Sequence, residues 1–352
     1  MADKENQHFV PQYYFRFFSK DQKSVSLLRK TNGTVVKTAP IKGQASKSYF
    51  YGDAAVERKI TEIESSFIAS LKKIRREKDF SLLSEEETLS ILQAITFQRS
   101  RTLGNRVNGK PQQDFFAKAM AEIAINTSQN LTDAEKQDLR KLIEFVEADP
   151  IPFQGMQMEI SIMQADHLAD LDRIVIKNRT KRPFILSDAP ALLINPLQQK
   201  VTIRGVLGML TPGIIWIFPL SSRLAIMFID KNGYKVKGKT KGALNIKSVA
   251  DVDELNKLQI LNATNAVYFD GFEFAPYIVS LWKEARKNLS DGPKGVVQEG
   301  ILMDAGQERE IVHFYEKQLP VMPKFSFLQY EEVDEHSQFM TEDYGTARAI
   351  YN

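Results

Sequence analysis

Two polar side chains near the start of the chain have the residue types needed for acid–base chemistry. His8 and Gln12 stand on either side of Phe9-Val10-Pro11, and further aromatic residues follow them. Histidine is a common proton carrier because its ordinary pKa lies near neutrality. Proline disfavours helical backbone at the residue before it, which predicts an extended segment with His8 and Gln12 on one face. We predict that His8 is a general acid or base and that Gln12 positions substrate or water; the alternative is a histidine that pins this segment into the core.

A second polar pair, Gln98 and Arg101, lies at the end of a predicted helix. Side chains three residues apart on a helix share a face, so both are expected to point the same way. A guanidinium can bind a phosphate or carboxylate through two parallel hydrogen bonds, which suits Arg101 to gripping an anionic substrate. The alternative is a structural ion pair with Glu57, Glu62 or Glu64 of the preceding predicted helix.

A third candidate is the carboxylate of Asp188, in the sequence Ser187-Asp188-Ala189-Pro190 after the apolar strand Phe184–Leu186. The end of a buried strand is a common place for a catalytic carboxylate or a ligand of a divalent metal ion. The same sequence is typical of an Asx turn, in which aspartate bonds its own backbone ahead of proline. No P-loop, dinucleotide-binding glycine motif, zinc-protease motif or serine-hydrolase elbow occurs in the sequence.

Charge is unevenly distributed along the chain, although the net charge is only +3. Segments 20–47 and 230–247 are rich in lysine, whereas segment 331–352 is acidic. Basic segments of this kind bind phosphate groups irrespective of sequence, and the alternative is a pair of solvated loops. The lysines predicted to contact nucleic acid are Lys30, Lys37, Lys235, Lys237, Lys239 and Lys241.

Composition restricts the setting in which the protein works. The 352 residues include no cysteine, which excludes disulfides, thiolate nucleophiles and cysteine-ligated zinc. The first residues are charged and lack the apolar core of a secretory signal. The longest apolar stretch, Val206 to Leu220, is interrupted by glycine and proline and is shorter than the about 20 residues that a bilayer-spanning helix needs. We therefore expect a cytoplasmic protein that does not enter a membrane.

Strands and helices cluster separately along the chain, which predicts an α+β fold rather than alternating βαβ units. An N-terminal β-hairpin is expected to turn at Asn32-Gly33, and a central helical block covers residues 53–148. In that block Pro111 is expected to begin the third helix, and Pro150 is expected to end the block. A mixed sheet with helices follows in the C-terminal half.

These parts are compatible with two domain arrangements. Residues 1–330 form either one large domain or two intimate subdomains, 1–150 with the hairpin and helical block and 151–330 with the sheet. In both arrangements residues 331–352 form an acidic C-terminal tail.

The sequence from His8 to Arg16, HFVPQYYFR, resembles the opening motif of the bacterial domain-of-unknown-function 4238 family, HFVPQ(F/Y)YL(R/K). The family often has the sequence Ser-Asp-Asn-Pro at a later site, where this chain has Ala189 in place of the asparagine. A role of that amide side chain is therefore absent here or is taken by another residue. Shorter similarities follow in the same order, so that the resemblance spans roughly residues 6 to 270. They are Tyr49–Tyr51 before the helix with Glu57 and Glu64, then Gln98 with Arg101, Ser187–Pro190, and Phe218–Ser221 followed by Leu255-Asn256.

Some members of this family occur among bacterial anti-phage defence genes, so the resemblance implies an effector directed at phage or host. We predict a nuclease or another nucleic-acid-processing enzyme, with His8 as acid or base, Gln12, Gln98 and Arg101 on the phosphate, and Asp188 as second carboxylate or metal ligand. One alternative is a non-enzymatic sensor or scaffold that binds a phage or host protein. Another is an enzyme acting on a nucleotide or small metabolite, which would need a deep pocket around Asp188 and Arg101.

Overall fold

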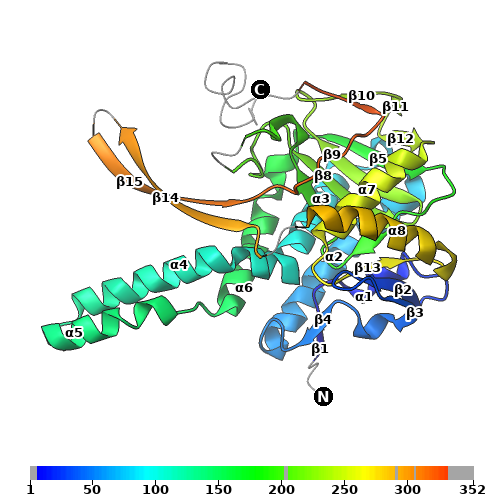
Figure 1. The fold of residues 1–352 in the computed structure, drawn as a ribbon. Coiled ribbons are helices and arrows are strands. Elements are labelled where there is room, and N and C mark those ends of the chain that lie inside the picture. The colour runs from blue at the N-terminus through cyan, green and yellow to red at the C-terminus, as the bar shows by residue number, and fades with distance from the viewer. Residues whose placement is uncertain (1–5, 202–204, 290–291, 305–306, 332–352) are drawn as a thin grey trace.

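The computed structural model describes residues 6–201, 205–289, 292–304 and 307–331, and it confirms an α+β fold (Figure 1). Nearly all of the predicted acidic tail, from 332 to 352, lies outside the described residues. The helices are α1 (Gln12–Arg16), α2 (Ala54–Glu77), α3 (Glu85–Ser100), α4 (Leu103–Thr127), α5 (Asp133–Arg140), α6 (Pro150–Met163), α7 (Val249–Asn262) and α8 (Ala275–Ala285).

The strands of the described residues form two larger sheets and three two-stranded pairs, β1 with β4, β10 with β16, and β14 with β15. The strands are β1 (Asn6–His8), β2 (Ser24–Arg29), β3 (Val35–Pro40), β4 (Ser46–Ser48), β5 (Asp172–Asn178), β6 (Leu186–Ser187), β7 (Leu192–Ile194), β8 (Ile215–Ser221), β9 (Leu224–Ile229), β10 (Lys235–Val236), β11 (Lys239–Thr240), β12 (Ala243–Ile246), β13 (Ala266–Phe269), β14 (Gly295–Asp304), β15 (Gln307–Glu316) and β16 (Leu328–Gln329).

The predicted N-terminal hairpin is strands β2 and β3, and it belongs to a four-stranded sheet in the order β3-β2-β13-β6. Its turn is the expected one: Gly33 has a φ of +73° and donates its N–H to the Arg29 carbonyl at 2.9 Å. Because β2 pairs antiparallel with β13, the start of the chain shares a sheet with residues more than 200 positions later.

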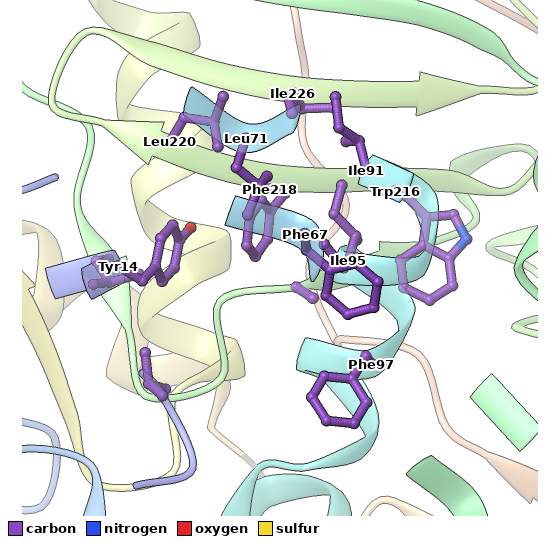
Figure 2. Close-up of a cluster of buried hydrophobic side chains, with 14 of the residues drawn as sticks. Tyr14, Phe67, Leu71, Ile91, Ile95, Phe97, Trp216, Phe218, Leu220 and Ile226 are labelled. Carbon is purple, nitrogen blue, oxygen red and sulfur yellow. The ribbon is translucent and has the colours of Figure 1, made fainter. Parts of the chain in front are cut away.

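A six-stranded sheet in the order β11-β12-β5-β9-β8-β7 forms the centre of the molecule. Alternate residues of β8 face opposite sides, as the pleat of a strand requires. Trp216, Phe218 and Leu220 pack in one buried cluster with side chains of α2 and α3 (Figure 2). Ile215 and Ile217 pack in a second cluster with α7 and α8. The first cluster also contains Phe97 and Met158, so residues on both sides of position 150 share one core.

The aromatic N-terminal segment is part of this first cluster. Pro11 caps α1, and the helix then turns Tyr14 and Phe15 into the core. The Tyr14 ring stacks on Phe218 with 4.8 Å between ring centroids, and its hydroxyl donates to the Pro219 carbonyl. The prediction of an extended segment through Gln12 is therefore wrong, because a helical turn lets neighbouring aromatic side chains reach the same core.

Two prolines have roles that differ from, or add to, those expected. Helix α4 begins at Leu103, where the Thr102 hydroxyl accepts from Asn105 N at 3.2 Å, and Pro111 lies inside the helix. The helical block ends as expected in the irregular residues 146–149, and Pro150 in addition begins α6. The first position of a helix needs no N–H donor, which is why proline is favoured there.

Two elements extend from the body on the same side, the helical arm of α4 and α5 and the hairpin of β14 and β15 (Figure 1). The hairpin pairs over its full length, from Gly295 opposite Glu316 to Asp304 opposite Gln307. Its base lies directly on α4, because a Cβ at position 295 would be 1.8 Å from the Asn108 carbonyl oxygen. Glycine at 295 is therefore required for this close approach.

No helix in the described ranges is both long enough and apolar enough to cross a bilayer.

Candidate functional site

The N-terminal motif is tied to helix α3 through its backbone carbonyls. Gln98 Nε2 donates to the Phe9 oxygen at 2.8 Å, and Arg101 Nη2 donates to the His8 oxygen at 2.5 Å. Both side chains are buried, and Arg101 is 1% exposed. The structure therefore brings the predicted polar pair and the motif together, and these contacts run to main-chain atoms.

Arg101 holds a buried ion pair at the end of α3. Its Nη1 bonds the Glu64 carboxylate of α2, and its Nε donates to the Tyr51 hydroxyl at 3.1 Å. Burial alone would lower the pKa of Arg101, but the Glu64 carboxylate and the Tyr51 hydroxyl raise it above its ordinary value. These contacts match the structural alternative for Arg101, and its grip on a ligand stays a prediction.

His8 and Gln12 have separate surroundings. The His8 ring is partly exposed, with Nε2 3.0 Å from the Lys42 carbonyl oxygen. Gln12 is the first residue of α1, and its Oε1 accepts from Arg16 Nη2 at 3.4 Å. The roles predicted for them, acid–base group and positioning amide, stay predictions.

Asp188 directly follows β6 and fixes the loop between α7 and β13. Its two carboxylate oxygens accept from the backbone N–H groups of Thr264 and Asn265, each at 2.7 Å. Burial raises the pKa of Asp188 to about 6, against the opposing effect of these bonds and of the Lys30 ammonium. The carboxylate thus shapes a loop that borders the cavities described below.

Two of the six candidate lysines already hold protein partners. Lys30 Nζ donates to the Leu261 carbonyl at 3.0 Å and to the Ala263 carbonyl, at the C-terminal end of α7. Cations are favoured at this end of a helix dipole. Burial lowers the pKa of Lys30, and the Asp188 carboxylate partly opposes that shift. Lys239 Nζ pairs with the Asp172 carboxylate.

The other four candidate lysines are exposed but lie in separate places. Figure 1 shows β3, which carries Lys37, and β10, which carries Lys235, at opposite ends of the body. Lys37 Nζ lies 5.7 Å from the centre of the Phe272 ring. The predicted lysines therefore do not form one continuous basic surface. The four are Lys37, Lys235, Lys237 and Lys241.

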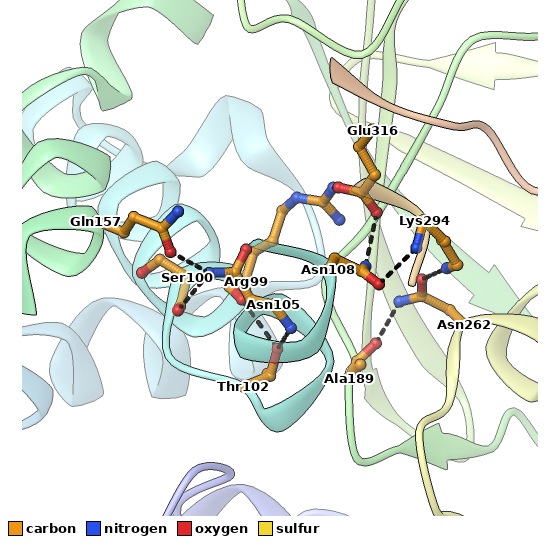
Figure 3. A network of polar contacts seen from close by, with 10 residues as sticks. All are labelled: Arg99, Ser100, Thr102, Asn105, Asn108, Gln157, Ala189, Asn262, Lys294 and Glu316. Atoms are coloured by element: carbon orange, nitrogen blue, oxygen red, sulfur yellow. Dashed lines mark hydrogen bonds and ion pairs between the residues drawn. The ribbon is translucent and has the colours of Figure 1, made fainter. Parts of the chain in front are cut away.

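The α3–α4 corner, α7 and the base of the hairpin meet at a network of polar side chains, the polar junction (Figure 3). Glu316 accepts from Arg99 Nη2 at 2.5 Å and from Asn108 Nδ2 at 3.1 Å. Lys294 donates its backbone N–H to Asn108 Oδ1 at 3.1 Å and its Nζ to Asn262 Oδ1 at 3.0 Å. The polar junction is defined as Arg99, Asn108, Asn262, Lys294 and Glu316.

Asn262 also connects the polar junction to the Asp188 loop, because its Nδ2 donates to the Ala189 carbonyl at 2.7 Å. The segment that the sequence singled out around Asp188 therefore borders this network. The contact is made by the backbone carbonyl of Ala189, the residue after Asp188.

Two adjoining cavities border the polar junction. The larger has a volume of about 160 Å³, and its walls include both Lys30 and Lys294. The smaller has a volume of about 20 Å³ and lies against Arg99 and Glu316. Gly104 lines both cavities in the first turn of α4, and a Cβ there would lie 2.8 Å from Thr264 Oγ1. Glycine at 104 therefore keeps the start of α4 open between the cavities.

Lys294 is the most perturbed cation of the polar junction. Burial lowers its pKa to about 8, the Glu316 carboxylate opposes this shift, and the cations Arg99 and Lys30 add to it. An amine with a pKa near 8 is partly uncharged at neutral pH. Lys294 can therefore act both as a cation and as a base or nucleophile.

Sequence reasoning missed the polar junction. Arg99 lies between the predicted site residues Gln98 and Arg101, and no sequence motif distinguishes it. Asn105 and Asn108 are three residues apart, a spacing that places both side chains on one face of a helix. This signal becomes visible once α4 is known to begin at Leu103. Lys294 and Glu316 belong to no motif, and the antiparallel pairing of the hairpin brings them to its base.

A metal centre finds no support in the part of the chain that the structure describes. Within it, no three histidine, aspartate or glutamate side chains are grouped so that they could hold a metal ion.

A family model described as "Protein of unknown function (DUF4238)" matches residues 6–271. These residues include the N-terminal motif, Arg99, Asn108 and Asn262, whereas Lys294 and Glu316 follow the matched region. No curated protein and no solved structure matches the chain.

The ion pair of Arg101 generates a prediction about stability. Glu64→Gln removes the negative charge and leaves the buried guanidinium uncompensated, which is expected to lower the free energy of unfolding by about 3 kcal/mol. Urea denaturation measures this loss. The matched control is Glu62→Gln on the same helix, an exposed position where a change within about 0.5 kcal/mol is expected. Equal effects of the two substitutions would contradict the assignment.

The burial of Lys294 generates a prediction about pH. Its pKa in the folded protein, about 8, lies below the ordinary 10.5, so folding disfavours its charged form. The resulting penalty is complete below pH 8 and is relieved as the pH rises from 8 to 10.5. Lys294→Met is therefore expected to raise the free energy of unfolding by about 1–3 kcal/mol at pH 7.

Urea denaturation of wild type and Lys294→Met at pH 7 and pH 10 measures this difference. The advantage of the variant should shrink at the higher pH. Lys287→Met, at an exposed lysine, should change stability little at either pH. A variant that is less stable than wild type at pH 7 would show that the lysine is not strained by burial.

Proposed function

We propose that this chain, a member of the DUF4238 family, binds a small anionic ligand, a phosphorylated metabolite or the phosphate end of a nucleotide, in the cavities beside the polar junction. The observation that carries the proposal is the position of Lys294, which lines a cavity of about 160 Å³ beside the start of α4. It corresponds to the alternative of an enzyme acting on a nucleotide or small metabolite, but the pocket predicted for that alternative lies around Asp188 and Arg101, and neither residue lines this cavity.

The charge around the larger cavity favours an anion. Lys30 and Lys294 line the larger cavity, whereas Arg99 and its ion-pair partner Glu316 line the smaller one. The Thr102 hydroxyl accepts from Asn105 N, whereas the N–H groups of Leu103 and Gly104 come before it at the positive end of the helix dipole. Gly104 brings this end of the helix to the cavity wall without a side chain in between. A phosphate group matches both the lysine and the helix end.

The size of the cavity restricts the ligand. Pockets for drug-sized ligands have volumes of roughly 300–1,000 Å³, whereas this cavity has about 160 Å³. That space suits a phosphate with a few carbon atoms. The neutral donors and acceptors of Asn108, Asn262 and Thr264 would bind hydroxyl groups of such a ligand.

The test uses inorganic phosphate as probe. Equilibrium dialysis with radiolabelled phosphate is expected to show one saturable site per chain. Lys294→Met should weaken binding about tenfold or more, because it removes a charge-assisted hydrogen bond. The matched control, Lys287→Met, should bind as wild type does. The proposal fails if phosphate does not bind, or if both variants bind it equally.

A nucleic-acid-processing role in anti-phage defence is the second proposal. It is supported by three exposed lysines on the segment from β10 to β12, and by the resemblance of the opening motif. The lysines are Lys235, Lys237 and Lys241.

This second proposal predicts salt-dependent binding of DNA or RNA. Changing Lys235, Lys237 and Lys241 together to glutamate should reduce affinity at low salt at least tenfold, while phosphate binding in the cavity stays as in wild type. Filter binding with a labelled duplex and a labelled RNA measures this. Unchanged affinity in the triple variant would reject the surface. A chain that binds neither phosphate nor nucleic acid would favour the non-enzymatic sensor or scaffold.

A further inference from the structure

The backbone of Lys294 is fixed on both sides. Its N–H donates to Asn108 Oδ1 at 3.1 Å, and its carbonyl accepts from Lys317 N at 2.8 Å. The next residue, Gly295, packs against the Asn108 carbonyl of α4. The side chain therefore starts from a rigid base and extends along the cavity to Asn262.

The two lysines that line the cavity have different surroundings. Lys30 Nζ donates to two carbonyl oxygens at the end of α7, those of Leu261 and Ala263. An ammonium group is the form that such acceptors favour. The structure gives Lys294 Nζ one such acceptor, the amide oxygen of Asn262, so its ammonium form gains less from hydrogen bonding than that of Lys30.

The charges that face Lys294 act on its ammonium group in both directions. Arg99 and Lys30 lie close enough to repel its ammonium group, and Glu316, which attracts it, already accepts hydrogen bonds from Arg99 and Asn108. A nucleophilic amine beside other cations is a known arrangement for enzymes that form Schiff bases with carbonyl substrates.

We propose that Lys294 Nζ is a nucleophile that condenses with the aldehyde or ketone group of a small anionic ligand in this cavity. The inference rests on the proposed function, because the anion site holds the carbonyl carbon beside the amine. It also narrows the ligand class to phosphorylated aldehydes and ketones.

The chemistry of the step is balanced without a further reactant. The lone pair of Nζ attacks the carbonyl carbon, and the C=O π electrons move to oxygen to give a carbinolamine. Loss of that oxygen as water, with the two protons from nitrogen, gives an uncharged imine. No oxidation or reduction occurs. The uncharged amine is the reactive form, so condensation is expected to accelerate as the pH rises toward 8.

The test traps the imine in the full-length chain. Glycolaldehyde phosphate is added with sodium cyanoborohydride, which reduces an imine to a stable secondary amine, and modified peptides are quantified by mass spectrometry. Lys294 is expected to be modified at least tenfold faster than the exposed lysine Lys287. Inorganic phosphate should slow modification of Lys294 and leave Lys287 unaffected. Lys294→Arg, which keeps the charge but lacks the nucleophilic amine, should give no adduct at 294.

Two outcomes separate this inference from the proposed function. If inorganic phosphate binds at one site and Lys294 is modified no faster than Lys287, the nucleophile is rejected and the anion site stands. If phosphate binding and selective modification are both absent, both proposals are rejected.

Discussion

The buried guanidinium of Arg101 is the interaction on which the arrangement of this fold depends. It contacts the His8 carbonyl of β1, the Tyr51 hydroxyl and the Glu64 carboxylate of α2 from the end of α3. A buried charge is tolerated when its partners are all in place, and removal of one is costly. The N-terminal motif, α2 and α3 are therefore held in one arrangement, and this accounts for an apolar chain start that lies in the core.

A second arginine, Arg99, lies near the same end of α3 and points to the opposite side of the helix. Residues two positions apart on an α-helix point about 200° apart, so Arg99 faces away from the Arg101 ion pair. It bonds Glu316 at the base of the β14–β15 hairpin. Helix α4 begins three residues after Ser100, with Gly104 in its first turn, beside Asn262 and Lys294. The α3–α4 corner thus contains both the Arg101 ion pair and a wall of the candidate ligand site.

Local signals in the sequence predicted local structure well. The Asn32-Gly33 hairpin is present, because its turn depends on a few neighbouring residues. The prediction of an extended Gln12 failed because core packing of the aromatic residues starts a helix directly after Pro11. The prediction for Pro111 failed because the Thr102 cap starts α4 before it. The polar junction lay beyond such reasoning, because it combines residues 99, 108, 262, 294 and 316 through tertiary packing.

The central claim is that the cavity beside Lys294 is an anion site built on the start of α4. The most direct measurement is a crystal structure of the protein grown or soaked with inorganic phosphate. We expect density for one phosphate in the larger cavity, within hydrogen-bonding distance of Lys294 Nζ and of a backbone N–H in the first turn of α4. A cavity filled only by side chains or water, with phosphate bound elsewhere or not at all, would contradict the account.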